Sequence, residues 1–384
     1  MLLNRNVNVA ENNDRIVLIG PVLPFRGGIA QHTTMLHRAL ESETTTLTLS
    51  FTRQYPSLLY PGKTDLDVTL GDYRENNVEY VIDSINPSTW NLAVQKVLIF
   101  NPRLIIFPWW HVYWSICFTW MARQFRRNGI EVVFLCHNVI EHESKWWKKI
   151  VAKFCLSNAS RFFVHSQEDK RNLLGLLPYS NVTVYPHPIN LHFPDPLGTK
   201  PRRAELEILF FGFVRHYKGL DLLIQAMGAF KGEDVVLSIV GEFWKDKATF
   251  VDHINSEGLD DQIDIIDRYV PDDEVADFFH RCDVVILPYR SATGSAVIPL
   301  AYRYSRPVIA TRVGGLPDVV QEGITGLLIH GGSPKEIEKA IRFFRENKHY
   351  FSKSNFKLIR EQLTWEKFTK SLLNPVKNEQ EQKN

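Results

Sequence analysis

The chain has 384 residues, of which 44% are hydrophobic and 23% charged, and its 45 basic and 43 acidic side chains give a net charge of +2. This length predicts two domains. The composition excludes a disordered or collagen-like chain, and the near-neutral charge argues against a dedicated nucleic-acid-binding protein. The four cysteines form no Cys-x-x-Cys pair, which favours a reducing, cytoplasmic compartment.

The N-terminal residues 1–14 are polar and include no apolar segment of signal-peptide length. Residues 104–122 carry no formal charge and are long enough to be considered as a membrane span. Pro108 and His111 interrupt this stretch, so it is interpreted as a buried strand over 104–107 and a separate helix over 113–125.

Short apolar runs of strand length alternate with helical patterns along the whole chain. The predicted strands cover residues 16–19, 104–107, 132–135, 161–164, 182–185, 208–211, 235–240, 284–287, 308–310 and 326–329. The predicted helices include 30–40, 220–230, 273–279 and 334–346. Because the strands are continuously apolar rather than alternating, they indicate parallel sheets covered by helices on both faces.

A stretch rich in proline, residues 186–205, divides the chain nearly in half and is predicted to be a stiff linker. The predicted organisation is a polar extension (1–14), a first domain (15–185), the linker, a second domain (206–348), a helical segment that packs back on the first domain (349–373) and a disordered tail (374–384). Both domains open with an apolar strand, a glycine-containing turn and a helix. This pattern predicts two doubly wound domains, with a ligand cleft between them at the carboxyl ends of the strands.

The turn at residues 212–219 (GFVRHYKG) is the strongest candidate for a phosphate site. A helix that begins near Leu220 directs free backbone N–H groups toward this turn. Arg215 and Lys218 add positive charge, while Gly212 and Gly219 permit a close approach of the backbone. The alternative is a basic, solvated turn. Because the chain has neither a Walker sequence nor G-x-G-x-x-G, nucleotide hydrolases and dinucleotide dehydrogenases are disfavoured.

Two further glycine pairs precede predicted helix starts. Gly314 and Gly315 precede Pro317, which suits a first helical turn, and the pair is interpreted as a second phosphate-sized opening. Gly27 and Gly28 could approach the same ligand from the first domain. An ordinary turn that requires positive φ is the alternative for Gly314 and Gly315.

These motifs together resemble the retaining nucleotide-sugar glycosyltransferases of family 4, which have the GT-B fold. The matching stretches are GGIAQHTTML at 27, HNVIEHES at 137, PHPINLHF at 186, FFGFVRHYKGLDLLIQA at 210, and the segment from Asp283 to Ile329. The resemblance implies a GT-B fold of two Rossmann-like domains, with the donor sugar-nucleotide bound mainly by the second domain and the acceptor by the first. It also implies metal-independent transfer of a sugar with retention at the anomeric carbon.

The resemblance also implies roles for individual residues. Arg215 and Lys218 would hold the donor diphosphate, and His111 would approach the donor sugar, so these three are the predicted catalytic residues. Further donor or phosphate contacts would come from Gly27, Gly28, Gly212, Glu242, Thr293, Gly294, Ser295, Gly314 and Gly315. His137 and Asn138 would lie on the acceptor side of the cleft. No metal and no cofactor is expected.

One departure from the family pattern concerns the pair of acids spaced Glu-x7-Glu that many members have. The corresponding positions here are Ala292 and Leu300. The segment 291–302 is similar to a variant in which Thr293, Gly294, Ser295 and backbone N–H groups make the donor contacts instead. A weakened donor site is the alternative.

Several histidines follow predicted strands. His137, His142, Glu141 and Glu143 crowd one segment, but no metal-site spacing such as H-E-x-x-H is present, so hydrogen bonding between the domains is favoured for His137 over a metal site. His111 is either a sugar contact or a packed loop residue.

The segment 143–154 (ESKWWKKIVAKF) combines apolar residues with lysines, as helices at membrane interfaces do. The candidate membrane contacts are Lys145, Trp146, Trp147, Lys148 and Lys149. We predict peripheral attachment to the inner face of the cell membrane. The alternative is a helix whose apolar stripe faces the core and whose lysines face solvent.

The leading prediction is therefore a glycosyltransferase that acts on a saccharide or lipid-linked saccharide, in bacterial polysaccharide or glycolipid assembly. One alternative is a GT-B-like sugar-nucleotide epimerase, which would require carboxylates that Ala292 and Leu300 do not provide. The other is a catalytically degenerate binding subunit of an assembly complex. The expected partners are a nucleotide-sugar donor and a saccharide or lipid-linked acceptor, without nucleic acid.

Overall fold

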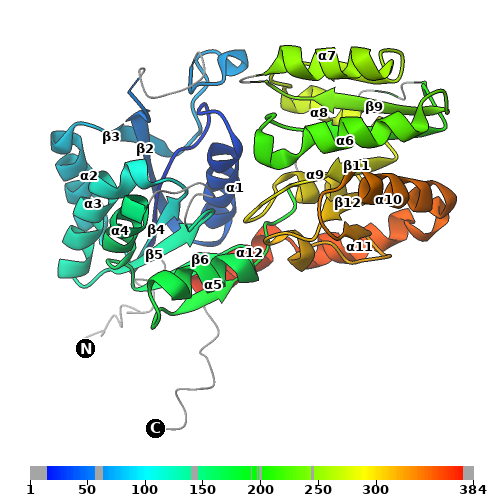
Figure 1. Cartoon of the computed structure of the whole chain (residues 1–384). Helices are drawn as coiled ribbons and strands as arrows, with labels where there is room; N and C mark the ends of the chain where they lie inside the picture. The colour runs from blue at the N-terminus through cyan, green and yellow to red at the C-terminus, as the bar shows by residue number, and fades with distance from the viewer. Residues whose placement is uncertain are drawn as a thin grey trace, which may run out of the picture. The chain divides into compact units, whose positions relative to one another are not determined.

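The computed structural model describes residues 15–56, 64–139, 146–191, 193–196, 198, 201–243 and 246–374, apart from the side chains of Asp272 and Asp273. The predicted extension 1–14, the predicted tail after Asn374 and the candidate membrane contact Lys145 lie outside these residues. The chain divides into two compact units, shown in Figure 1. Unit 1 comprises the described residues up to Val164, Lys170–Val184 and the described residues from Thr369 onward, and unit 2 comprises His165–Asp169 and Tyr185–Phe368.

Unit 1 is built on a seven-stranded sheet with the order β3-β2-β1-β4-β5-β6-β7, in which all neighbouring strands are parallel. Its strands are β1 (Arg15–Ile19), β2 (Thr45–Arg53), β3 (Val78–Asp83), β4 (Leu104–Trp109), β5 (Glu131–Cys136), β6 (Arg161–Val164) and β7 (Val182–Val184). Its helices are α1 (Gly28–Glu43), α2 (Pro87–Phe100), α3 (Ser115–Arg127) and α4 (Trp146–Leu156), whereas α5 (Gln167–Leu176) and α12 (Trp365–Leu373) include residues of both units. Helices α2, α3 and α4 lie side by side on one face of this sheet, and α1 lies against the other (Figure 1).

Unit 2 has a six-stranded parallel sheet with the order β10-β9-β8-β11-β12-β13. Its strands are β8 (Leu206–Phe211), β9 (Val235–Val240), β10 (Ile263–Ile266), β11 (Val284–Leu287), β12 (Val308–Thr311) and β13 (Gly326–Ile329). Its helices are α6 (Leu220–Met227), α7 (Lys247–Glu257), α8 (Asp272–Arg281), α9 (Val297–Arg303), α10 (Pro334–Glu346) and α11 (Lys353–Gln362). Helices α6, α7 and α10 share one apolar cluster with the sheet, and α8, α9 and α11 share another, so both faces are covered.

The predicted parallel sheets with helices on both faces, and the Rossmann-like character of both halves, are confirmed. All ten predicted strands are present, but β2, β3 and β10 were missed. In β2 (TTLTLSFTR) polar and apolar residues alternate, and β3 and β10 are edge strands with only partial burial. A search for continuous apolar runs therefore misses a strand with buried polar residues, such as Thr48 and Ser50 of β2, as well as partly exposed edge strands.

The uncharged stretch 104–122 contains β4, a short 3-10 turn at Val112–Trp114 and most of α3, as the two-element interpretation predicted. In the part of the chain that the structure describes, no helix is long and apolar enough to cross a membrane.

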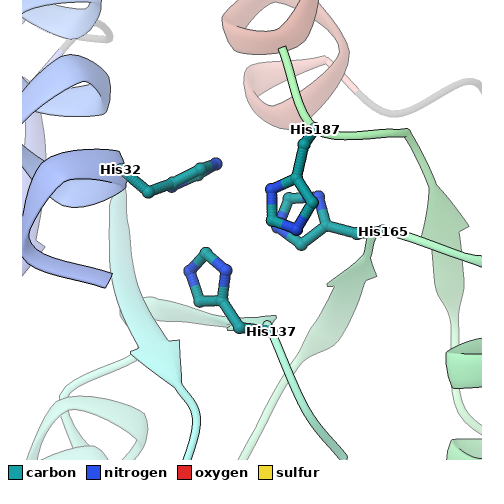
Figure 2. A group of neighbouring side chains, drawn as sticks. All are labelled: His32, His137, His165 and His187. Carbon is teal, nitrogen blue, oxygen red and sulfur yellow. The ribbon is translucent and has the colours of Figure 1, made fainter. Parts of the chain in front are cut away.

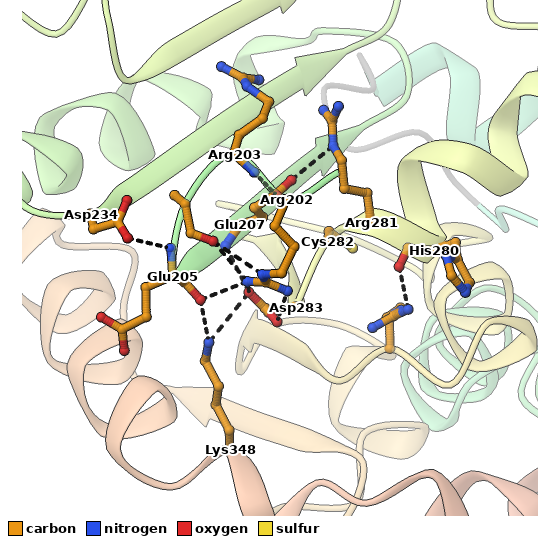
Figure 3. A network of polar contacts seen from close by, with 12 residues as sticks. Arg202, Arg203, Glu205, Glu207, Asp234, His280, Arg281, Cys282, Asp283 and Lys348 are labelled. Carbon is orange, nitrogen blue, oxygen red and sulfur yellow. Dashed lines mark hydrogen bonds and ion pairs between the residues drawn. The ribbon is translucent and has the colours of Figure 1, made fainter. Parts of the chain in front are cut away.

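A polar network fixes the end of the proline-rich segment to the amino-terminal edge of the unit 2 sheet (Figure 3). Arg202 donates two hydrogen bonds to Asp283, at 3.1 and 2.6 Å, and the Asp283 carboxylate also accepts from the backbone N–H of Glu207. Glu207 is buried and pairs with Arg281 at 2.8 Å. Because every buried charge has a partner, the network is consistent with a structural role.

Candidate functional site

Two loops of unit 2 meet at the point where the order of the sheet reverses. Strands β8 and β11 are neighbours in the middle of the sheet, and the helices that follow them, α6 and α9, belong to apolar clusters on opposite faces. After these strands the loops 212–219 and 288–296 lead the chain to helices on opposite faces of the sheet. In doubly wound folds this divergence creates the ligand-binding crevice.

The turn at 212–219 has a backbone that requires glycine at both ends. Gly212 has φ +97° and Gly219 has φ +67°, in a region that residues with a Cβ rarely adopt. A Cβ on Gly219 would lie 2.1 Å from the carbonyl oxygen of Pro288. The turn therefore packs directly against the loop that follows β11. The positive φ of Gly212 and Gly219, and the close approach at Gly219, explain why glycine is present at both positions.

Lys218 is buried in this turn, with a residue exposure of only 8%. Its Nζ atom lies 5.8 Å from the centre of the Tyr289 ring and 3.1 Å from the position that a Cβ on Gly212 would occupy. Burial, reinforced by the charge of Arg215, lowers the pKa of Lys218 to about 8. The carboxylate of Asp221, two residues after Gly219, pairs with Arg290. A buried ammonium in such a setting favours an anionic ligand.

Arg290 joins the two loops of unit 2. Its backbone N–H donates to the carbonyl of Tyr217 at 2.7 Å, and its guanidinium donates to the carbonyl of His216 at 3.0 Å. The same guanidinium makes a bidentate pair with Asp221, with distances of 2.8 and 2.6 Å. The sequence-based prediction missed Arg290, because its contacts follow from β8 and β11 being neighbours.

The loop that replaces the family's acidic pair is closely packed. Ala292 is buried, and its carbonyl oxygen lies 1.4 Å from where a Cβ on Gly314 would be. The carbonyl of Thr293 lies 2.3 Å from the corresponding position of Gly315. Backbone atoms therefore occupy the Cβ positions of both glycines, and this packing explains why neither position 314 nor 315 carries a side chain. The phosphate contact predicted for this pair stays a prediction.

Within this loop, the hydroxyl of Ser295 accepts a hydrogen bond from the backbone N–H of Val297 at 3.3 Å and lies 3.5 Å from the Tyr289 hydroxyl. Gly294 lies near His187: a Cβ on Gly294 would be 3.8 Å from the His187 ring. Leu300 is half-buried in the apolar cluster of α8, α9 and α11. An apolar position 300 is therefore explained by packing, whereas donor contacts of Thr293, Gly294 and Ser295 stay predictions.

Glu242 follows β9, and its backbone contacts the turn at 212–219. Its carbonyl accepts from the N–H of Val214 at 3.0 Å. The preceding Gly241 has φ +147° and lies so close to Gly212 that a Cβ would be 2.3 Å from the carbonyl oxygen of Gly212. The role predicted for the Glu242 side chain toward the nucleotide stays a prediction.

In unit 1 the corresponding loops follow β1 and β4, the central pair of that sheet. Gly27 has φ +96° and precedes α1 directly, and no atom lies within 4 Å of the Cβ position of Gly27 or Gly28. The adjoining backbone is held by two hydrogen bonds, from Arg26 N–H to the carbonyl of Asp65 at 2.8 Å and from Asp67 N–H to the carbonyl of Pro24 at 2.7 Å. The residues before the glycines are therefore held by hydrogen bonds to the segment 65–67, whereas the space at the Cβ positions of Gly27 and Gly28 is open.

His111 caps the short turn after β4. Its Nδ1 accepts a hydrogen bond from the backbone N–H of Tyr113 at 3.0 Å. An Nδ1 that accepts assigns the ring proton to Nε2 in the neutral imidazole. His111 therefore has both a structural bond and a second nitrogen with the donor chemistry that a sugar hydroxyl or phosphate requires.

His137 follows β5 at the same edge of the unit 1 sheet. Its backbone N–H donates to the carbonyl of Trp109 at 2.8 Å, and its ring meets the ring of His32 edge to face at 4.6 Å. Figure 2 shows this pair in unit 1 and, in unit 2, His165 and His187, whose rings stack at 3.7 Å. Burial lowers the pKa of His187 to about 4, so this ring is neutral at neutral pH. The cleft-side roles of His137 and Asn138 stay predictions.

The bulky apolar residues that precede and alternate with the lysines of α4 face solvent, whereas a second set of smaller apolar residues faces the core. Trp146, Ile150 and Phe154 are 75%, 59% and 53% exposed, and Trp147 is also exposed. The side of the helix that faces the core carries Ala152, Cys155 and Leu156. The alternative of an apolar stripe packed in the core is therefore wrong for this helix.

The comparisons with known proteins cover both halves of the chain. Residues 26–193 match the family model described as Glycosyltransferase Family 4, and residues 199–361 match the model described as Glycosyl transferases group 1. Together the two matches span most of the sequence. The chain therefore belongs to these glycosyltransferase families and has the GT-B fold that the sequence resemblance implied.

Similar curated proteins are also glycosyltransferases. A glycosyltransferase of Methanocaldococcus jannaschii is 32% identical over 41% of this chain and 44% of its own length. D-inositol 3-phosphate glycosyltransferase 1 of Catenulispora acidiphila is 27% identical over 49% of each chain. GDP-mannose:glycolipid 4-beta-D-mannosyltransferase of Xanthomonas campestris is 24% identical over 50% of this chain and 54% of its own. The chain spans about half the length of the curated relatives it matches.

Solved structures share the fold over nearly the full chain. Anabaena HepE in complex with UDP has a TM-score of 0.72 at 18% identity and covers 94% of this chain and 100% of its own. Sucrose-phosphate synthase of Thermosynechococcus elongatus has a TM-score of 0.70 at 18% identity, over 95% and 100%. At this identity the similarity establishes the architecture alone.

Proposed function

We propose that the chain transfers a sugar from a nucleotide-sugar donor to a saccharide or lipid-linked saccharide, with retention at the anomeric carbon. The observation that carries this proposal is the buried cation Lys218, which lies beside Arg215 on a glycine-bounded turn where the unit 2 sheet order reverses. A diphosphate is an anion of suitable size for such a turn. The two matched family models agree with this choice of ligand class.

The proposed reaction breaks the bond between the anomeric carbon and the diphosphate oxygen and forms a bond from that carbon to an acceptor hydroxyl oxygen. The bonding electrons leave with the nucleoside diphosphate, and the hydroxyl proton is released to it. Arg215 and Lys218 stabilise the charge that builds up on the leaving oxygens. Such stabilisation is strongest in the transition state, so loss of either cation lowers kcat more than it raises KM.

His111 is proposed to contact the donor sugar or its phosphate through Nε2–H, while Nδ1 stays bonded to the backbone of Tyr113. Gly27 and Gly28 would leave room beside α1 for donor phosphate and acceptor. His137 and Asn138 are proposed to line the acceptor side. We also propose that Arg215 and Lys218 meet the charge requirement without a metal, so activity should persist in EDTA.

A panel of UDP-, GDP- and ADP-sugars tests the proposal. Binding is measured by calorimetry, and slow donor hydrolysis by NMR, which also reports whether the released sugar first appears with the anomeric configuration of the donor. Arg215→Ala is the matched variant and is expected to lose at least tenfold in donor hydrolysis. Binding without hydrolysis or transfer would favour the binding-subunit alternative, and undiminished activity of the variant would contradict the proposed clamp.

We further propose that α4 attaches the chain to an anionic membrane surface, on the inner face of the cell membrane. Support comes from the exposed side chains of Trp146, Ile150 and Phe154 next to Lys148, Lys149 and Lys153. Arg123 of α3 lies 4.4 Å from the Phe154 ring and adds a further charge. Tryptophan suits the headgroup region, and each lysine near an anionic leaflet contributes about 1 kcal/mol.

Sedimentation with vesicles containing phosphatidylglycerol tests this attachment. The triple variant Trp146→Ala, Ile150→Ala, Phe154→Ala should lose most of the binding, and vesicles of phosphatidylcholine alone should bind weakly. Ile99→Ala, which removes an exposed side chain on α2, is the matched control and should bind normally. Equal binding by the triple variant and the wild type would contradict the proposal.

A further inference from the structure

Arg290 is the residue that fastens the phosphate turn of unit 2 to the loop after β11. It makes four hydrogen bonds, and all of them go to the segment that contains the turn: to His216, to Tyr217 and, twice, to Asp221. Two of these acceptors are the carbonyls of consecutive residues between Arg215 and Lys218. A main-chain donor and a planar guanidinium that hold neighbouring carbonyls restrict rotation of the turn.

The contacts of the preceding residues reinforce this attachment. The carbonyl of Pro288 lies under Gly219, and Tyr289 has its ring near the Nζ of Lys218 and edge to face with Tyr217 at 6.0 Å. Residues 288–290 thus all contact the turn that carries Arg215 and Lys218.

Arg290 also neutralises the negative charge of Asp221, beside the phosphate turn. Asp221 is in the first turn of α6, two residues after Gly219. The hydrogen bond from Arg290 is the main cause that lowers the pKa of the Asp221 carboxyl, so this carboxylate is ionised at neutral pH. An unpaired carboxylate beside an anion site would oppose the binding of a diphosphate.

We propose that Arg290 is a positioning residue of the donor site. It holds the turn in the geometry that presents Arg215 and Lys218 to the donor diphosphate, and it cancels the opposing charge of Asp221. The inference rests on the proposed function, because it assumes that the turn binds a diphosphate. Arg290 and Asp221 need not touch the donor.

A double variant distinguishes a purely structural role of Arg290 from a positioning role, because the two roles predict different diphosphate affinities for it. If Arg290 only stabilised the fold, removing Asp221 in addition would leave binding as poor as in the single variant. If Arg290 positions the turn and cancels the charge, removing the Asp221 charge should restore part of the affinity.

The test compares Arg290→Ala, Arg290→Lys, Asp221→Asn and the double variant Arg290→Ala/Asp221→Asn by calorimetry in the full chain. The probes are UDP, GDP and ADP and the matching nucleosides uridine, guanosine and adenosine. Arg345→Ala is the matched control, because Arg345 pairs with Glu233 at 2.5 Å, just before the amino-terminal end of β9.

For the nucleoside diphosphate that the wild type binds, Arg290→Ala should weaken affinity about tenfold, equivalent to ~1.4 kcal/mol. The double variant should recover about threefold of that loss, Arg290→Lys should be intermediate, and Asp221→Asn and Arg345→Ala should stay within about twofold of the wild type. Affinity for the matching nucleoside should not change in any variant, because nucleosides lack the diphosphate.

Normal diphosphate affinity in Arg290→Ala overturns the proposal. An equal loss for nucleoside and diphosphate, or an equal loss in Arg345→Ala, also overturns it, because a general loosening of unit 2 then explains the effect. A double variant no better than Arg290→Ala overturns the charge-cancelling role. If the wild type binds none of the three diphosphates, the proposed function itself fails together with this inference.

Discussion

The turn after β1 in unit 1 and the turn after β8 in unit 2 have similar sequences but differ in their surroundings. Both join the first strand of a doubly wound sheet to a helix through glycines with positive φ. Around Gly219 the backbone of Pro288 leaves no room for a Cβ, and a buried lysine lies one residue away. Around Gly27 and Gly28 no atom lies within 4 Å of the Cβ positions.

We propose that this difference corresponds to different tasks of the two turns. A closely packed turn with a desolvated cation suits a ligand group that is always the same, such as a diphosphate. A turn with open space beside its two glycines suits a ligand that is larger or more varied. In the proposed reaction the unit 2 turn would hold the donor diphosphate, and the unit 1 turn would leave room for donor phosphate and acceptor. Four sets of variants test whether the two turns differ in this way.

The largest difference is expected between Gly219→Ala and Gly28→Ala. A Cβ at position 219 meets the carbonyl of Pro288 at 2.1 Å and has φ +67°, so we expect a loss of more than ~3 kcal/mol in the free energy of unfolding and no measurable diphosphate binding. Gly28→Ala meets no neighbour and should change stability by less than ~1 kcal/mol. Thermal and denaturant unfolding measure both. Equal losses would mean that the turns do not differ as described.

Lys218→Met should separate binding from stability. Diphosphate affinity should fall about 100-fold, because a charge-assisted contact is lost in a buried site. Because the pKa of Lys218 is lowered to about 8, the charged lysine costs stability below that pH, and the cost disappears as the pH rises toward the unfolded value of about 10.4. The variant should therefore be at least as stable as the wild type at pH 7.

Calorimetry and unfolding between pH 7 and 9.5 check this prediction. Wild-type affinity for the diphosphate should fall as the pH rises through 8, and the Lys218→Met affinity should show a weaker dependence. A destabilised Lys218→Met with unchanged affinity would argue that Lys218 is structural.

His111→Ala and His111→Asn test the open side of the comparison. We expect about a 30-fold loss in kcat for both, with little change in diphosphate affinity, because the proposed Nε2–H contact to the reacting sugar disappears. His111→Ala should also lose about 1 kcal/mol of stability with the cap on Tyr113, whereas asparagine can retain that cap. Steady-state kinetics and thermal unfolding separate the two effects, and normal kcat in His111→Asn would exclude the sugar contact.

The smallest effect on function is expected from the network at the opposite edge of unit 2 (Figure 3). Burial alone would raise the pKa of Asp283, but hydrogen bonds from Arg202 and the Glu207 N–H outweigh it and lower the pKa. Asp283→Asn should cost about 1–3 kcal/mol of stability at pH 7 and leave diphosphate affinity unchanged.

The pH dependence of unfolding checks the sign of this effect. A carboxylate with a lowered pKa stabilises the fold above its unfolded value of about 3.9, and this contribution is lost as the pH falls through the folded pKa. The difference between Asp283→Asn and the wild type should therefore shrink under acid conditions. Asp264→Asn, at an exposed ion pair of the same unit, is the control and should cost less than ~1 kcal/mol.

Much of the fold could be predicted from local patterns. Strands such as Val235–Val240 and Val284–Leu287 are continuously apolar and were predicted with the observed bounds. Strands β2, β3 and β10 could not be found in the same way. Buried polar residues such as Thr48 and Ser50 interrupt the apolar run of β2, and β3 and β10 are partly exposed edge strands.

The candidate site likewise contains residues that could be predicted from the sequence and one that could not. Arg215, Lys218 and the two glycines that bound their turn were recognisable because a strand, a turn and a helix follow one another directly in the sequence. Arg290 was not recognisable, although it lies only three residues after a predicted strand, because nothing in the sequence states which strands are neighbours.

The parallel sheets, the family and the charged turn could all be predicted from the sequence, because each depends on residues that are close together in the chain. Three other properties follow from the folded structure: Lys218 is buried, backbone lies at the Cβ position of Gly314, and the bulky apolar side chains on one side of α4 are exposed. These properties depend on which distant segments pack together. Strand order and the packing of helices on each sheet, rather than local propensity, therefore decide which of the recognisable motifs become open, buried or exposed sites.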